Sequence, residues 1–234
     1  MKDDPTNPEV RAAYEAMAKE TLDQYKDFVD SGFTIEVDNE EPYANSQEMI
    51  DDLRNNNRIK IFSTEAGFGS VPITDEQRQK NPLLQDSGFK DAKGNTLLVN
   101  DVFRAIHDFY GHAELGNSFG PKGEENAWNI HARMFSPLAR RAMTTETRGQ
   151  NSYVNFSGVN EKIDKLREEA RKLREQGDEE GAKLIVDKIY QEGLFADQKI
   201  GLLPEEFSQF DEEDAGDVTM RPEGLQERDM TATQ

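Results

Sequence analysis

Cysteine is absent from the 234 residues of the chain. This absence excludes disulfide bonds, thiolate metal ligands and cysteine nucleophiles, and it fits a reducing compartment. Long apolar runs are absent too, since no segment reaches the roughly 18 to 20 apolar residues that a membrane span needs. The first residues, MKDDPTNPEV, lack the apolar stretch of a secretory signal. We therefore expect a soluble, cytoplasmic protein without a membrane partner.

Basic residues are scarce, with 28 Lys and Arg against 47 Asp and Glu and a net charge of −19. This balance argues against a broad nucleic-acid-binding surface. Residues 1–50 carry 13 acids and 4 bases, and residues 204–234 carry 10 acids and 2 bases, so 17 of the 19 net negative charges lie in these flanks. The nearly neutral middle therefore remains open to an anionic substrate. Because only 35% of the residues are hydrophobic, we expect part of the chain to be solvated extension rather than core.

The hydrophobic pattern predicts a mostly helical α+β fold with a single compact domain over residues 1–203. Asn7 and Pro8 form a helix-start signal, and apolar residues then recur at helical spacing as far as Ser31. Alternating residues predict two short strands. Charged residues interleaved with a heptad-like apolar pattern predict an antiparallel helical hairpin. The expected segments are strands at 33–37 and 58–62, further helices at 46–55, 100–110 and 124–135 and from 137, a mostly loop segment at 64–97, a metal or active-site core at 95–156, the hairpin at 159–193 and an acidic, flexible tail at 204–234.

The only three histidines, His107, His112 and His131, fall within 25 residues of the neutral middle. This clustering favours a shared metal or catalytic site over helix capping. On an ideal α-helix, residues five apart are separated by about 140°, so His107 and His112 would not face one ion. We expect Gly111 to take a left-handed conformation and end the helix, which would let His112 turn back toward His107. Asp108 is a candidate catalytic residue that would orient an imidazole, or else a solvated helix residue.

Glu124 and His131 lie within about 20° of each other when the segment EENAWNIHARMF is projected as a helix. Glu125 lies more than about 100° away from them. A carboxylate and an imidazole on a core-facing side are costly to bury unless they are paired or bound to metal. We assign Glu124 as the metal ligand and His131 as a catalytic residue that orients a ligand or faces substrate, and the reverse assignment stays open.

Two imidazoles and one carboxylate form the ligand set of non-haem Fe(II) oxygenases, and the same set holds catalytic Zn²⁺. The polar block TTETRGQNSYVNF follows this segment. Arg148 could bind a carboxylate or phosphate, and Gln150 and Asn151 an amide or base edge. The alternative is a helix end and loop that hydrogen-bond their own backbone.

The segment HDFYGH, preceded by DVFRAI, resembles the iron-binding segment of the aromatic amino acid hydroxylases. The resemblance implies His107 and His112 as iron ligands and a glutamate of the pair Glu124 and Glu125 as the third. It does not extend to their pterin-binding or substrate-binding segments. Residues 95–207 as a whole are similar to uncharacterised proteins of tailed bacteriophages, which implies a location in the host cell or the virion.

Three hypotheses follow from the sequence. The first is a non-haem Fe(II) oxygenase or hydroxylase that acts on a small-molecule or nucleobase-like substrate. The second is a hydrolase that uses Zn²⁺ or Mn²⁺ on the same ligands. The third is a non-enzymatic virion or assembly protein, in which the hairpin or the acidic tail binds a protein partner.

Overall fold

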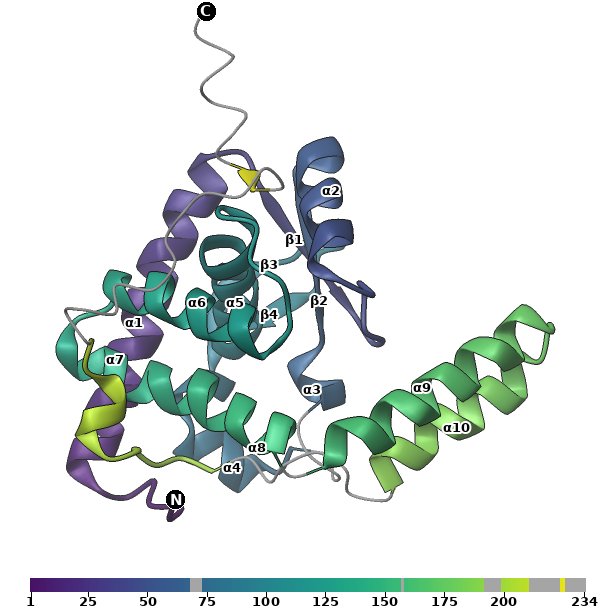
Figure 1. Ribbon diagram of the computed structural model, residues 1–234. Coiled ribbons are helices and arrows are strands. Elements are labelled where there is room, and N and C mark those ends of the chain that lie inside the picture. The colour runs from purple at the N-terminus through teal and green to yellow at the C-terminus, as the bar shows by residue number, and fades with distance from the viewer. Residues whose placement is uncertain (68–72, 157, 192–198, 211–223, 226–234) are drawn as a thin grey trace, which may run out of the picture.

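The structure is a computed structural model that describes residues 1–67, 73–156, 158–191, 199–210 and 224–225. It confirms a mostly helical α+β fold (Figure 1). None of the helices in these ranges combines the length and apolarity that crossing a lipid bilayer requires.

Helix α1 (Pro8–Asp30) begins and ends where the sequence predicts. The Asn7 side chain accepts hydrogen bonds from the backbone amides of Glu9 and Val10, which satisfies donors that a helix start leaves unpaired. The helix is long enough to join two hydrophobic clusters, since Met17 packs in the first and Phe28 in the second. A polar residue between them, Gln24, is thereby held inside the molecule with 7% of its surface exposed.

The two predicted strands pair in parallel. Strand β1 (Thr34–Asp38) connects through α2 (Ser46–Asn56) to β2 (Arg58–Phe62), with Ile35 opposite Ile59. The expectation that residues 64–97 are mostly loop missed a second sheet, the antiparallel pair β3 (Asp86–Lys90) and β4 (Thr96–Leu98). The same stretch also holds the short helices α3 (Thr64–Gly67), α4 (Asp75–Lys80) and η1 (Pro82–Leu84).

The middle of the chain is a series of short helices around α5 (Val99–His107). Like α1, this helix joins both clusters, through Phe103 on one side and Ile106 on the other. The Asp101 side chain caps its start by accepting from the Leu98 backbone amide, and it also accepts from the amide of Thr64 in α3. The segments that follow are η2 (Asp108–Ala113), α6 (Pro121–His131), η3 (Ala132–Met134), α7 (Pro137–Thr144), η4 (Thr145–Gly149) and α8 (Gln150–Phe156).

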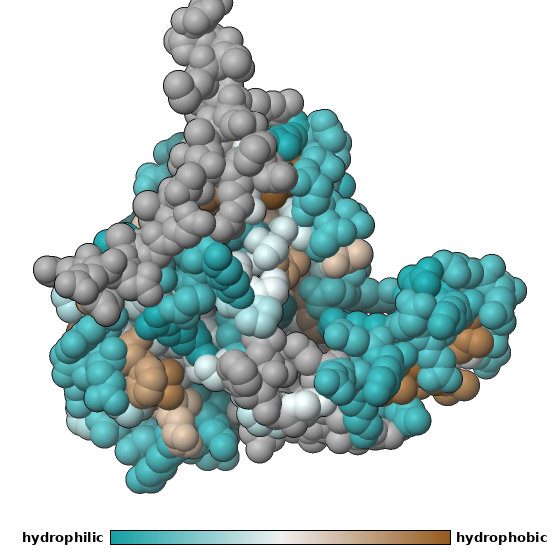
Figure 2. Space-filling view, in the orientation of Figure 1, coloured by the Kyte–Doolittle hydropathy of each residue, from teal (hydrophilic) through white to brown (hydrophobic). Residues whose placement is uncertain are grey.

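Helices α9 (Val159–Glu175) and α10 (Glu179–Gln191) form the predicted hairpin, which projects from the rest of the molecule (Figure 1). A small apolar cluster that includes Ile163 and Ile189 joins the two helices. Arg174 forms an ion pair with Glu40 of the main body at 2.9 Å. The exposed surface of the hairpin is largely hydrophilic (Figure 2). The end of the predicted hairpin, residues 192–193, lies outside the described residues.

After the hairpin, the described residues include two parts of the predicted tail, residues 204–210 and 224–225. Residues 199–203 pack against the main body, and η5 (Glu205–Ser208) and Phe210 continue along it. The Phe210 ring lies 5.5 Å from that of Trp128. Leu225 packs against the second hydrophobic cluster, and Gly224 accepts a hydrogen bond from Arg54. The predicted flexibility of residues 211–223 and 226–234 concerns residues outside the described part.

Candidate metal centre

Three predicted ligands converge between α5, η2 and α6. One ligand atom from each of His107, His112 and Glu124 lies within 4.8 Å of the other two. The Glu124 Oε2 atom is 3.5 Å from His112 Nε2 and 3.9 Å from His107 Nε2. A single transition-metal ion binds such atoms at about 2.1 Å, so small side-chain shifts would bring all three into its coordination sphere.

The two histidines meet because the chain makes a π turn. Helix α5 does not stop at Gly111 but continues as the π-helical segment η2, in which the Glu114 amide donates to the Phe109 carbonyl five residues earlier at 3.0 Å. Such a turn takes in one more residue than an α turn, so residues five apart fall on nearly the same side of the helix. The prediction that a left-handed Gly111 turns the chain back is wrong, since Gly111 is not among the residues with positive φ.

Gly111 instead allows close helix packing. A Cβ atom at this position would lie 3.0 Å from the Ala127 Cβ atom and 3.2 Å from the Ala127 carbonyl oxygen. The missing side chain therefore lets η2 approach α6, which carries Glu124. The glycine contributes to the site through the distance between two helices rather than through backbone freedom.

A chain of hydrogen bonds orients His107. The Gln24 Nε2 atom donates to the Met134 carbonyl at 3.3 Å, which leaves Gln24 Oε1 to accept from His131 Nε2 at 2.8 Å. Burial holds the pKa of His131 well below its ordinary value, so this ring is neutral and carries its lone pair on Nδ1. That nitrogen lies 3.1 Å from His107 Nδ1 and accepts its proton. The lone pair of His107 is consequently on Nε2, which faces Glu124.

His112 is oriented by the backbone. Its Nδ1 atom donates to the Asn117 carbonyl at 3.3 Å, which directs Nε2 toward Glu124. The Asn117 side chain in turn donates to the Gly111 carbonyl at 2.8 Å. The Phe119 ring packs edge-on against the His112 ring, with 5.1 Å between centroids. The loop after η2 therefore holds the second imidazole in place.

Glu124 is the ionised partner of both histidines. Its burial opposes ionisation, but the neighbouring His107 and His112 hold the pKa of Glu124 well below its ordinary value. Burial likewise works against the charged form of His112, but Glu124 raises the pKa of His112 above its ordinary value. Asn151 donates to Glu124 Oε2 at 2.9 Å. A metal ion would bind here in place of a proton, as is general for imidazole and carboxylate ligands.

The structure distinguishes Glu124 from its neighbour. Glu125 is exposed and forms an ion pair with Arg148, whose guanidinium also lies 3.3 Å from the centre of the Trp128 ring and donates to the Phe207 carbonyl at 2.8 Å. Of the two glutamates, Glu124 is therefore the one that faces the histidines. His131 is fully buried with both ring nitrogens engaged, so it is placed to orient a ligand and has no open face for substrate.

The three predicted substrate-binding residues each contact a glutamate. Arg148 contacts Glu125, Asn151 contacts Glu124, and Gln150 donates to Glu146 Oε2 at 2.9 Å. The contacts of Arg148 and Asn151 join η4 and α8 to α6, and the segment is helical rather than the loop of the structural alternative. The role of Arg148, Gln150 and Asn151 in substrate binding stays a prediction.

Asp108 does not orient an imidazole by hydrogen bonding, since His131 and the Asn117 carbonyl occupy those positions. Its side chain is partly buried, and burial raises the pKa of Asp108, whereas His112, His107 and Arg104 favour its ionised form. Sequence reasoning passed over Arg104, which lies one helical turn before His107. Its guanidinium carbon is 5.7 Å from the centre of the Phe62 ring.

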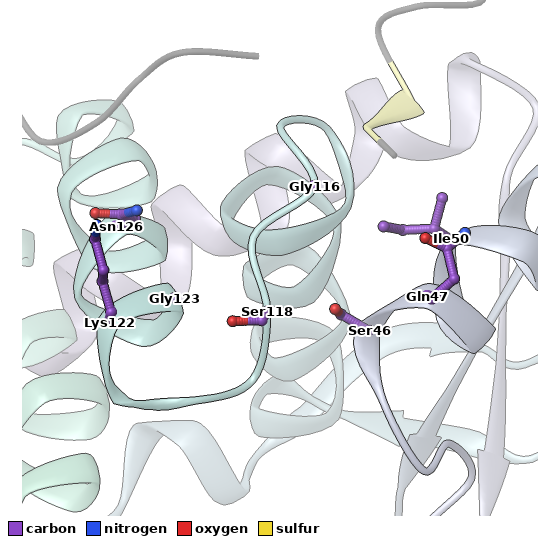
Figure 3. Close-up of a pocket in the computed structure, with 8 residues that line it drawn as sticks. All are labelled: Ser46, Gln47, Ile50, Gly116, Ser118, Lys122, Gly123 and Asn126. Atoms are coloured by element: carbon purple, nitrogen blue, oxygen red, sulfur yellow. The ribbon is translucent and has the colours of Figure 1, made fainter. Parts of the chain in front are cut away.

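A pocket of about 430 Å³ is lined by residues of α6, of α2 and of the loop before α6 (Figure 3). Lys122 and Asn126 line it from α6, Ser118 from the preceding loop, and Ser46 from α2. Positions 122 and 126 are one turn apart, whereas Glu124 projects from the opposite side of the helix. Glu124 therefore points away from this pocket, and we assign the pocket no part in the candidate site.

Comparison with family models, with curated proteins and with solved structures gives no match to this chain.

Proposed function

We propose that the protein binds a divalent transition metal through His107, His112 and Glu124 and acts as a non-haem Fe(II) oxygenase or hydroxylase on a small-molecule or nucleobase-like substrate. The observation that carries the proposal is the convergence of two imidazole Nε2 atoms and one carboxylate oxygen within 4.8 Å of one another. Two histidines and one carboxylate with remaining open positions are typical of Fe(II) centres that activate O₂.

The surroundings of the three ligands support a metal rather than a chance cluster. Each imidazole is held with its proton on Nδ1, by His131 in one case and by the Asn117 carbonyl in the other. Hydrogen bonding of the distal ring nitrogen is a general property of metal-binding histidines, because it sets the tautomer and the ring orientation. Bound Fe(II) would supply the redox chemistry, while these residues fix the direction from which the ligands approach it.

Metal binding is tested with the full chain and two matched variants. We expect the wild-type protein to bind one equivalent of Fe(II) under anaerobic conditions, measured by equilibrium dialysis with metal analysis. Glu124→Ala should lose this binding, whereas Glu125→Ala, on the same helix turn but paired with Arg148, should retain it. Equal metal content in the wild type and in Glu124→Ala would overturn the proposal.

Oxygen consumption separates the oxygenase from the hydrolase hypothesis, since both use the same ligands. We expect the Fe(II)-loaded wild type, supplied with ascorbate, to consume O₂ faster than His107→Ala. Full metal binding without O₂ consumption would favour a Zn²⁺ or Mn²⁺ hydrolase. Absence of metal binding would favour the third hypothesis, a virion or assembly protein, which does not require converging ligands.

A further inference from the structure

Within the part of the chain that the structure describes, Arg104 is a cation without an ion-pair partner, on the helix that carries the candidate ligand His107. Within the described ranges, no carboxylate or carbonyl oxygen lies within hydrogen-bond or ion-pair distance of its guanidinium, and its ring contact with Phe62 is loose at 5.7 Å. Among the other described arginines, Arg58 pairs with Asp52, Arg78 with Glu65 and Arg148 with Glu125. In a chain with 47 acids against 28 bases, a partly buried arginine without an acidic partner requires an explanation.

The position of Arg104 connects it to the site. It lies on α5 three residues before the ligand His107 and four before Asp108, and residues at these spacings share one face of a helix. The positive charge of Arg104 favours the ionised form of Asp108. The two side chains do not form an ion pair, since no salt bridge within 4.0 Å joins them. The nearest other acid on this helix, Asp101, already accepts from two backbone amides. No acidic residue of α5 therefore occupies the N–H donors of the Arg104 guanidinium.

The charges of the site depend on the metal. Without an ion, the carboxylate of Glu124 is balanced by a proton on the imidazoles beside it. A divalent cation in place of that proton adds one positive charge to the site. The site would then attract an anionic group, with Arg104 offering two parallel N–H donors, the arrangement that binds carboxylate and phosphate best.

We propose that the substrate of the metal site carries an oxyanion group, a carboxylate or a phosphate, which Arg104 binds while another part of the molecule lies at the metal. This inference rests on the proposed function, because it takes His107, His112 and Glu124 as the metal ligands. It assigns the substrate-binding arginine to α5 instead of to Arg148, which Glu125 and Trp128 already occupy.

The test measures anion binding to the Co²⁺-loaded protein by isothermal titration calorimetry, with succinate and inorganic phosphate as probes. We expect one of the two anions to bind, and its identity distinguishes a carboxylate from a phosphate group. Arg104→Gln should weaken that binding by roughly ten- to a hundredfold, the usual effect of losing hydrogen bonds to a charged group. Removing the metal should weaken it at least about tenfold, because the site then carries less positive charge.

Two further variants make the result specific. Arg104→Lys keeps the charge but not the fork, so we expect affinity between those of the wild type and Arg104→Gln, even if the latter folds poorly. Arg78→Gln, which removes an arginine paired with Glu65, should bind the anion like the wild type. Equal anion affinity in the wild type and both Arg104 variants, or no binding of either probe, would overturn this inference while leaving metal binding intact. Failure of Co²⁺ to bind the wild type would instead overturn the metal centre itself.

Discussion

Replacing His131 with phenylalanine would test the chain of hydrogen bonds behind the metal centre. The His131 ring is fully buried and lies 5.0 Å from the Phe135 ring and 6.0 Å from the Phe103 ring, so this environment accepts another aromatic ring. The substitution removes two nitrogens and little else. It leaves His107 Nδ1 without its acceptor and Gln24 Oε1 without its donor.

The size of the effect follows from these two lost partners. Each buried polar group left unpaired costs about 1 to 3 kcal/mol, so the free energy of unfolding should fall by about 2 to 6 kcal/mol. Metal affinity should fall by about ten- to a hundredfold, because His107 is then free to change tautomer and rotate. Urea unfolding of the metal-free protein measures the first quantity, and competition with a chromophoric chelator measures the second.

A double variant separates the two effects. Adding Gln24→Leu to His131→Phe removes the unpaired Gln24 oxygen, so stability should recover by about 1 to 3 kcal/mol. Metal affinity should stay low, since His107 Nδ1 still lacks its acceptor. Wild-type metal affinity in the His131→Phe variant, or recovery of affinity in the double variant, would refute the role given to this chain.

Three shorter predictions concern the surroundings of the site. Burial raises the pKa of Glu146 from its ordinary value of 4.5 to about 7. Between pH 4.5 and pH 7, Glu146 is therefore protonated in the folded protein and ionised in the unfolded chain. The free energy of unfolding should therefore fall by up to about 3 kcal/mol as pH rises through this window, and Glu146→Gln should abolish that loss in urea titrations. Gly111→Ala should destabilise the protein by about 1 to 3 kcal/mol through contact with Ala127, and adding Ala127→Gly should restore part of the melting temperature; no loss would contradict the packing argument. Asn151→Ala, which removes a donor from Glu124, should weaken metal binding by about tenfold in the chelator assay, and unchanged binding would show that this donor does not position the ligand.

The convergence of His107, His112 and Glu124 could be predicted from sequence because it depends on few features. Three histidines in 25 residues define the segment, and a helical projection singles out Glu124 against Glu125. The prediction for Gly111 was wrong because a glycine after a helical pattern has the same sequence signal in two cases. It can end the helix, or it can permit close packing against another helix. Only the position of Ala127, on another helix, distinguishes the two.

Other features depend on pairing between distant segments. The connection of Gln24 to His131 spans 107 residues, and neither residue indicates the other by spacing. Arg148 and Arg104 look alike in sequence, but among the described residues only the first has a carboxylate partner. The hairpin of β3 and β4 was missed because DSGFK and TLL are short and alternate poorly.

The π turn at η2 also affects how this site would be found in other chains. A π turn contains one residue more than the α turn it replaces. If a related protein lacks that residue, its helix would be regular and its second histidine would follow the first at a spacing of four, which also places both on one face. An alignment would then need a gap inside a helix, where gaps are normally penalised. Search patterns for this centre should therefore accept both spacings.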